Sequence, residues 1–325
     1  MHSRPDLEIL ICTHNRVALL ERALDSLDRA HRPDACRVSV LVAANACSDG
    51  TEEMLARRER GGRQEGRLPL RWIQVPTPGK SVALNRAVDE LVAPVVAFVD
   101  DDHRVDEGYL AGVVDAVRRY PDVELFCGRI IPDWDGSEPE WVHDQGPYRI
   151  YPLPVPRFDQ GESPRVIEPG TVTPGGGDLF MRKTLFERVG PFSTDLGPVG
   201  HNLGGAEDIE WVRRAMALGE TLQYVPTVTQ YHYVDSSRLS LRYLMRKAYE
   251  RSMASVRVAE KIEVSDRLPP YLVRKPLGYA AQALFSVSSQ RRRHYLVRTA
   301  AALGELRGYL RRQGHLRTEL RRKES

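Results

Sequence analysis

Short apolar runs alternate with segments of helical periodicity through the first half of the chain. Four of these runs are predicted to be buried strands, at residues 7–12, 38–44, 70–75 and 95–99. Between them, apolar side chains recur at helical spacing over residues 20–27 and 83–91. Strands that alternate with helices in this way predict an α/β fold with a mostly parallel sheet.

Polar residues follow each of the four predicted strands. The carboxyl ends of parallel strands meet at one edge of a sheet, and open sheets of this kind bind their ligands beyond that edge. We therefore expect several of these polar groups to lie along one edge and to form the functional site. They occupy residues 13–16, 45–51, 78–80 and 100–102.

The second half of the chain is less regular. Residues 131–170 are rich in proline, lack periodicity and contain several aromatic side chains, which predicts a covering loop rather than a disordered segment. Later elements are expected at 178–182 (strand), 207–218 (helix), 222–225 and 228–233 (strands), and from residue 240 onward (helices). This pattern predicts an α/β domain over residues 1–237 and a helical extension over residues 238–325.

The net charge of +3 conceals a polarised chain. Residues 238–325 contain 21 Lys and Arg against 7 Asp and Glu, a local charge of +14, so the remainder carries −11. An acidic body favours a site assisted by a cation, and a basic extension favours contact with an anionic surface.

The location of the protein is predicted from features that the sequence lacks. Four scattered cysteines have neither the spacing of a zinc site nor that of a disulfide framework. The first residues do not resemble a signal peptide, and the apolar stretch from Leu277 is shorter than the roughly 20 residues that cross a bilayer. We expect a cytoplasmic protein, with any membrane contact peripheral and on the inner face.

Three consecutive carboxylates, Asp100, Asp101 and Asp102, end the fourth apolar run. An isolated triplet of this kind is most often a turn that begins a helix, because Asp favours the first helical positions. Here the triplet follows a predicted buried strand, where a hard divalent cation such as Mn²⁺ or Mg²⁺ would relieve the repulsion between the carboxylates. The position therefore favours a metal that bridges the carboxylates to a diphosphate.

Seven segments in order resemble the family-2 glycosyltransferases, which have the GT-A fold and use sugar nucleotides. They are ICTHNR, NACSDGT, PGKSVALNRAV, FVDDD, PGGGDLFMRK, GGAEDIEW and YHYV, spread over roughly residues 7–235. The set is most similar to a bacterial subgroup in which a Pro- and Trp-containing loop follows the metal site. The resemblance implies a nucleotide-binding sheet flanked by helices, with residues 131–170 as an acceptor loop and a basic helical C-terminal extension.

The resemblance also implies the chemistry of the site. Asp102 would bind the metal, with Asp100 near the ribose and Asp101 beside them. His232 would be a further metal ligand, although a histidine between tyrosines is as often a packed core residue. Asp208 would be the base of an inverting, single displacement, because an acceptor hydroxyl must lose its proton. Glu207 would help hold the acceptor, yet acidic residues at helix starts are common without any such role.

The donor site implied by the resemblance draws on several segments. Three successive glycines before Asp178 let backbone approach a ligand, although PGGGD is also a plausible plain turn. Lys80 would reach the diphosphate or be a surface lysine, and Trp134 and Trp141 would contact the acceptor. The expected nucleotide and donor contacts are Thr13, Asn15, Arg16, Asn45, Lys80, Asn85, Asp100, Asp101, Gly176, Gly177 and Asp178.

Two departures from the family pattern leave the donor open. Many relatives carry an aspartate that pairs with the nucleobase where this chain has Ala44, so a uracil donor is less favoured and guanine or thymine stays open. Relatives often carry asparagine where this chain has Asp178, so their sugar specificity does not transfer. The expected partners are a nucleoside-diphosphate sugar and a hydroxyl acceptor, which would be a glycan, a lipid-linked molecule or a small molecule.

The basic extension has two interpretations. Leu296, Leu303 and Leu310 recur every seventh residue, which favours a helix packed on the catalytic body. The alternative is a peripheral helix attracted to an anionic membrane surface, which would deliver the enzyme to a lipid-linked acceptor. No nucleic-acid-binding motif surrounds the arginines at 291–293, so nucleic acid is not expected, and a homo-oligomer stays open.

Rival functions are less consistent with these residues. A sugar nucleotidyltransferase would need a glycine-rich, basic phosphate loop after its first strand, and residues 13–16 do not supply one. An inactive sugar-nucleotide-binding module would not need Asp208. Membrane-spanning synthases of the same family carry Gln-x-x-Arg-Trp after the base, whereas residues 243–247 read YLMRK, so addition of a single sugar is expected.

Overall fold

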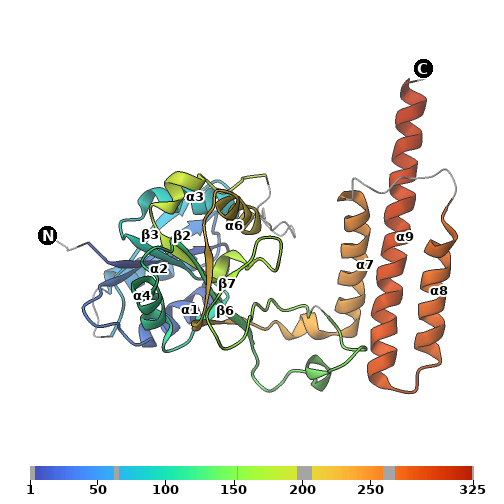
Figure 1. Cartoon of the computed structure of the whole chain (residues 1–325), viewed down its shortest axis with the longest axis horizontal. Helices are drawn as coiled ribbons and strands as arrows, with labels where there is room; N and C mark the ends of the chain where they lie inside the picture. Colours follow the sequence, from blue (N-terminus) through green and yellow to red (C-terminus); the bar gives the residue numbers. More distant parts are fainter. Residues whose placement is uncertain (1–3, 62–65, 152, 196–206, 259–267, 324–325) are drawn as a thin grey trace. The chain divides into compact units, whose positions relative to one another are not determined.

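The computed structural model describes residues 4–61, 66–151, 153–195, 207–258 and 268–323. The chain divides into two compact units (Figure 1). The first, which we call the sheet unit, comprises Met1–Asp133 and Pro156–Tyr233. The second, which we call the helical unit, comprises Trp134–Val155 and Val234–Ser325.

The sheet unit is built on one mixed sheet, which has nine strands among the described residues. Its first half is parallel: β1 (Leu7–Thr13) lies between β2 (Val38–Asn45) and β4 (Val95–Phe98), and β3 (Leu70–Val75) pairs with the far side of β2. The four apolar runs therefore form strands close to their predicted bounds. The predicted α/β fold is confirmed.

The second half of the sheet adds antiparallel pairings. β8 (Leu179–Arg182) joins β4 to β6 (Leu125–Asp133), and β9 (Leu222–Tyr233) runs parallel to β6. β9 also carries β5 (His103–Val105) and β7 (Arg165–Ile167), both antiparallel to it.

Two predictions differ from this arrangement. Two strands were expected where β9 is one. Pro226 lies between the two predicted strands, where the β6–β9 register shifts, a position that tolerates a residue without an N–H. Residues 131–170 were expected to be irregular, but β6 continues to Asp133 and β7 lies within the segment.

Helices cover both faces of the sheet (Figure 1). Successive β1 residues point to opposite faces, so Leu10 packs in one core cluster with Ala83 and Trp211, while Ile9 packs in the other with Leu24. The helices of this unit are α1 (Val17–Arg29), α2 (Thr51–Arg60), α3 (Lys80–Glu90), α4 (Tyr109–Arg119), α5 (Leu185–Val189) and α6 (Glu207–Ala217).

The helical unit contains α7 (Leu241–Val258), α8 (Pro270–Leu284) and α9 (Ser289–Lys323), and α9 packs against both others. The α7–α9 contact depends on glycine: a Cβ at Gly308 would lie 2.7 Å from the Met253 carbonyl oxygen, and one at Gly304 would overlap the carbonyl of Tyr249. Leu303 and Leu310 of the leucine repeat are exposed, so the repeat is not the main packing face. None of the described helices combines the length and hydrophobicity needed to cross a membrane.

Candidate active site

The aspartate triplet lies at the carboxyl edge of the parallel strands and is held by neighbouring side chains. The Thr13 hydroxyl donates to Asp101 Oδ2 at 2.8 Å. The Arg16 guanidinium donates to Asp101 Oδ1 and to Asp102 Oδ2, both at 2.9 Å. The chain then turns into β5 rather than into a helix. The alternative that the triplet begins a helix is therefore wrong.

A lysine balances the first carboxylate of the triplet. Lys80, the first residue of α3, places its Nζ 3.1 Å from Asp100 Oδ1 and 3.8 Å from Glu207 Oε1. Burial alone would raise the pKa of Asp100, but Lys80 and the histidines beyond it hold that pKa below its ordinary value. Burial would likewise lower the pKa of Lys80, which Asp100, Asp208 and Glu207 raise above its ordinary value. The pair is therefore ionised.

Asp101 differs from its neighbours. Burial raises the pKa of Asp101 to about 6, and the adjacent Asp102 adds to the rise while Arg16 and Thr13 oppose it. The three carboxylates thus have different environments, although they are consecutive in the chain. Asp101 takes up a proton more readily than Asp100 does.

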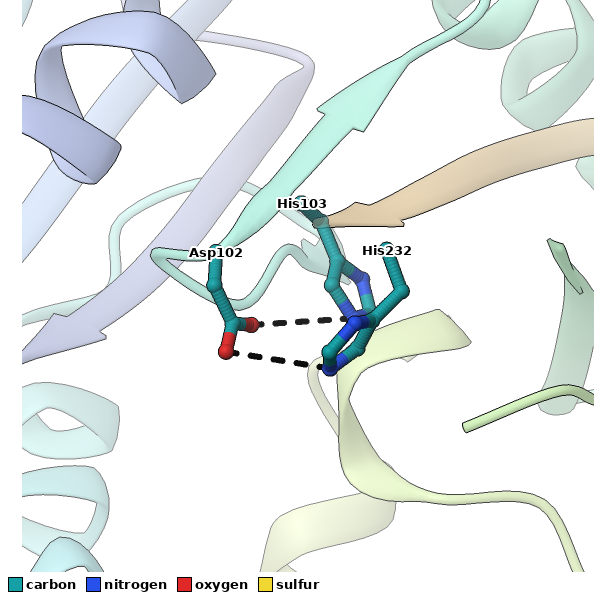
Figure 2. Close-up of side chains that lie close together, drawn as sticks. All are labelled: Asp102, His103 and His232. Atoms are coloured by element: carbon teal, nitrogen blue, oxygen red, sulfur yellow. Dashed lines mark ion pairs between the residues drawn. The ribbon is translucent and has the colours of Figure 1, made fainter. Parts of the chain in front are cut away.

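Asp102 faces two histidines, His103 and His232 (Figure 2). His103 Nε2 lies 3.8 Å from Asp102 Oδ1, and His232 Nε2 lies 3.7 Å from Asp102 Oδ2. The antiparallel pairing of β5 with β9 puts the two histidines directly opposite each other, with ring centroids 5.0 Å apart. One atom from each side chain lies within 4.8 Å of the others, so the three converge on one point.

Hydrogen bonds fix the tautomer of both imidazoles. Buried Gln230 donates its amide N–H to the Phe98 carbonyl at 2.9 Å, which leaves its Oε1 to accept from His103 Nδ1 at 2.7 Å. His232 Nδ1 donates to the Tyr233 carbonyl at 2.6 Å. In its neutral form each ring therefore carries its proton on Nδ1 and directs Nε2 toward Asp102.

This donor set suits a divalent metal ion. Two imidazoles and one carboxylate can hold a divalent transition-metal ion, and burial lowers the pKa of His232, which favours the neutral ring that a metal requires. His232 was predicted as a ligand, whereas His103 was not. The signal was its position directly after the triplet, but β5 is only three residues long and its pairing with β9 is not visible in the sequence.

Two glycines bring the candidate base close to the triplet. Asp208, in the first turn of α6, accepts from the Gly176 N–H at 2.5 Å. A Cβ on Gly176 would lie 2.9 Å from Asp208 Cβ, and one on Gly177 would lie 2.5 Å from Asp100 Oδ2. Asp100 and Asp208 also line the same cavity, together with Lys80. The backbone of the glycine segment therefore lies close to both Asp100 and Asp208, with no side chain in between.

Three predicted donor residues hydrogen-bond to the backbone of neighbouring loops. Asn45 donates to the carbonyls of Val75 and Thr77 and accepts from the Gly79 N–H. Asn85 exchanges two hydrogen bonds with the backbone of Phe192. Asn15 accepts from the N–H groups of Ser48 and Asp49. These amides shape the loops around the site, and direct contact with a donor stays a prediction.

Asp178 is the one predicted donor residue whose carboxyl group has no hydrogen-bond partner. The side chain is buried beside β6 and α4, and neither carboxyl oxygen is hydrogen-bonded. Burial raises the pKa of Asp178 well above its ordinary value, and the nearby charges of Asp100 and Asp208 raise it further. The folded protein therefore favours the neutral acid at this position.

Replacing this acid by asparagine should stabilise the protein in a pH-dependent way. The folded-state pKa of Asp178 lies above the unfolded one, so the stability it supports is present at low pH and lost as the pH rises through the folded pKa. We expect Asp178→Asn to raise the free energy of unfolding by about 1–3 kcal/mol at about pH 8, and by less at about pH 5. Urea denaturation of both proteins measures the difference; a loss of stability, or an equal gain at both pH values, would contradict it.

The two predicted acceptor residues belong to the helical unit. Trp134 and Trp141 pack with Val142, Val155 and Leu239. The Arg293 guanidinium lies 5.4 Å from the centre of the Trp141 ring. The two side chains thus help to join their loop to the helices, and their contact with an acceptor stays a prediction.

Comparison with known proteins identifies the class of enzyme. The sequence profile of glycosyl transferase family 2 matches residues 8–190, more than half of the chain. The chain therefore belongs to glycosyl transferase family 2 and is a glycosyltransferase. Succinoglycan biosynthesis protein ExoM of Rhizobium meliloti (strain 1021) is 23% identical over 309 residues, which cover 94% of this chain and 93% of that protein.

Solved structures share the fold. S. aureus TarS 1–349 in complex with UDP-GlcNAc matches with a TM-score of 0.53 and 15% identity, over 94% of this chain and 91% of that one. This chain spans only 54% of the longer TarS chain. Mannosyltransferase PcManGT from Pyrobaculum calidifontis, in complex with GDP-Man and Mn²⁺, matches with a TM-score of 0.52 and 18% identity, over 93% and 87% of the two chains. The predicted GT-A fold is confirmed.

Proposed function

We propose that this glycosyltransferase is metal-dependent and inverting, and that it moves one sugar from a nucleoside diphosphate to an acceptor hydroxyl. The observation that carries the proposal is the position of Asp208. Asp208, far from the aspartate triplet in the sequence, lines one cavity with Asp100 and Lys80, and the segment formed by Gly176 and Gly177 lets it approach the candidate metal site. A single displacement needs the base and the leaving group on opposite sides of the sugar carbon, and a donor sugar bound between Asp208 and the metal site would meet this requirement.

Each part of the site has a task in this reaction. Asp208 removes the proton of the acceptor hydroxyl as the new bond forms. Asp102, His103 and His232 would hold Mn²⁺ or Mg²⁺, and the bound ion would supply positive charge for the departing diphosphate. Lys80 adds a second positive charge beside Asp100.

The remaining predicted residues position the donor. Thr13 and Arg16 hold Asp101 and Asp102 in place. The N–H groups and absent side chains of Gly176 and Gly177 let the donor sugar approach the backbone. Asp178, as a neutral acid, sits directly behind this segment and is a candidate hydrogen-bond donor to the sugar.

What the similar proteins indicate about the substrates is part of this proposal. The structures similar to this chain include complexes with UDP-GlcNAc and with GDP-Man, so they do not select a base. The name of the ExoM relative refers to polysaccharide biosynthesis, which suits an acceptor in surface polysaccharide or glycoconjugate synthesis, lipid-linked or otherwise. We place the reaction in the cytoplasm, at the inner face of the membrane.

The test is the release of nucleoside diphosphate. Purified protein with Mn²⁺ is expected to release UDP, GDP or dTDP from one of a panel of sugar nucleotides when acceptor mixtures are present, and to stop when a chelator removes the metal. Thermal shifts with each free nucleotide and Mn²⁺ identify the base. The absence of turnover with every donor and broad acceptor mixtures would refute the proposal, and release of pyrophosphate would point to nucleotidyl transfer instead.

A further inference from the structure

The helix α8 has an exposed apolar side. Leu277 is 65% exposed and Leu284 is 73% exposed, and their spacing of seven residues places them on the same side of the helix as Val273. Other apolar residues of α8, Leu272 and Ala283, are buried. α8 packs on α9 (Figure 1) and therefore uses only part of its apolar surface within the helical unit.

The exposed apolar surface continues into the turn between α8 and α9. Phe285 is 82% exposed and Val287 is fully exposed (101%), while Ser286 between them is buried and donates to the Gln282 carbonyl. This hydrogen bond ties the middle of the turn to the end of α8. We call Val273, Leu277, Leu284, Phe285 and Val287 the α8 apolar face. An exposed phenylalanine and valine at the tip of a helical hairpin cost free energy in water unless something covers them.

The charge around the α8 apolar face indicates which kind of partner can cover it. Residues 238–325 carry a charge of +14, so a second copy of the same basic stretch is repelled by it. Arg274, next to Val273, and Arg292, in the first turn of α9, are both exposed. Cations beside exposed apolar side chains match the boundary between anionic lipid headgroups and acyl chains.

Aromatic residues complete the pattern of an interfacial surface. Tyr271, Tyr279 and Tyr295 line a groove together with Arg274 and Lys275. Tyrosine rings favour the headgroup region, where one end of the side chain is apolar and the other is hydrated. The groove and the apolar face both involve α8, on different sides of the helix.

We propose that the α8 apolar face is a docking surface for a bilayer that contains anionic phospholipid. Phe285 and Val287 enter the acyl boundary, Leu277 and Leu284 lie along it, and the surrounding arginines contact the headgroups. None of the described helices crosses the membrane in this arrangement. The binding itself does not depend on the proposed transferase reaction, because it uses only the helical unit.

The position of the aromatic loop gives this docking a consequence for the acceptor. The Asp144 carboxylate pairs with Arg293 at 3.0 Å, and the Gln145 carbonyl accepts from Gln290 at 2.9 Å. Gln290 and Arg293 lie in the first turns of α9, a few residues after the turn that carries Phe285 and Val287. If the proposed transfer reaction is correct, docking therefore holds the loop that carries Trp141 near the membrane, which suits a lipid-linked acceptor.

Vesicle flotation of the full chain, without donor or metal, tests the proposal. Vesicles of phosphatidylcholine with phosphatidylglycerol should bind the protein more tightly than vesicles of phosphatidylcholine alone, and added salt should weaken the difference. The double variant Phe285→Ser/Val287→Ser should bind both vesicle types at least about tenfold more weakly than the parent. Arg292→Gln should lose about fivefold, on the anionic vesicles only.

Matched controls distinguish docking through the α8 apolar face from nonspecific adsorption through any exposed apolar side chain. Val172 and Leu218 of the sheet unit are 57% and 60% exposed, and the double variant Val172→Ser/Leu218→Ser should bind like the parent. Thermal unfolding should be unchanged in both double variants, because all four side chains are exposed. The proposal is wrong if Phe285→Ser/Val287→Ser floats like the parent, or if the parent ignores both vesicle types. It is also wrong if this variant only disrupts an oligomer seen by sedimentation.

Because no sugar nucleotide is present in these assays, a failure of docking leaves the proposed transfer reaction untouched. Conversely, an inactive protein that still floats with anionic vesicles would contradict the reaction and support the docking surface.

Discussion

Asp208→Asn is expected to lower the rate of sugar transfer by about 10²–10⁴-fold, the range over which general bases contribute. Asparagine has nearly the same shape, and its carbonyl oxygen can still accept from the Gly176 N–H that Asp208 binds. The glycine segment and the nucleotide site should therefore be preserved. Turnover of the donor measures the first effect, and calorimetric titration with nucleoside diphosphate measures the second.

Glu210→Gln is the matched control for this variant. Glu210 lies on the same helix, two residues further on, and pairs with Arg214 at 2.8 Å. The same change from acid to amide there should leave transfer close to that of the parent, because an exposed ion pair of this kind contributes little. Undiminished transfer by Asp208→Asn would remove this residue as the base, and loss of nucleotide binding would assign it a structural role instead.

Asp102→Ala is expected to abolish tight binding of Mn²⁺ and to lower transfer by roughly 10²–10³-fold or more, as the loss of one group that stabilises a developing charge does. The two imidazoles would remain, without the carboxylate of the group. Arg16 keeps its hydrogen bond to Asp101, so the loop should stay in place. Electron paramagnetic resonance of Mn²⁺ reports the metal directly, independently of turnover.

His103 permits a finer test of the same site. His103→Ala should weaken Mn²⁺ binding and remove one nitrogen coupling from the resonance signal, and Gln230→Leu should weaken binding by about 10–100-fold, because it frees the ring that Gln230 orients. His143→Ala, a histidine of the helical unit, is the control and should change neither quantity. If His103→Ala binds Mn²⁺ like the parent while His232→Ala loses this binding, His103 is a packed core residue and not a metal ligand.

The sequence predicted the parallel half of the sheet well, because each buried strand is a continuous apolar run bounded by polar residues. β5 was missed since three residues are too few to show alternation. α4 was also missed, although Leu110, Val113 and Ala116 are buried on one side of it. β5 lies between the triplet and α4, and no side-chain cap marks the start of this helix at Gly108.

The site was predictable in type but not in its contacts. Residue types and order indicated which side chains belong to it, yet the approach of Asp208 to Asp100 depends on a backbone segment that only glycine allows. The sequence likewise could not show that His103 faces His232, because this follows from strand pairing between distant segments. Nor could it show that Arg16 bridges two of the three carboxylates.

Asn45 illustrates how such a scaffold affects the interpretation of mutants. One side-chain amide ties the end of β2 to the carbonyls after β3 and to the N–H that precedes α3, the helix that begins with Lys80. Substitution of Asn45 would displace a lysine that it never touches. A mutational screen scored on activity alone would therefore count this amide as a substrate ligand, when its measured effect arises from the misplacement of a neighbouring cation.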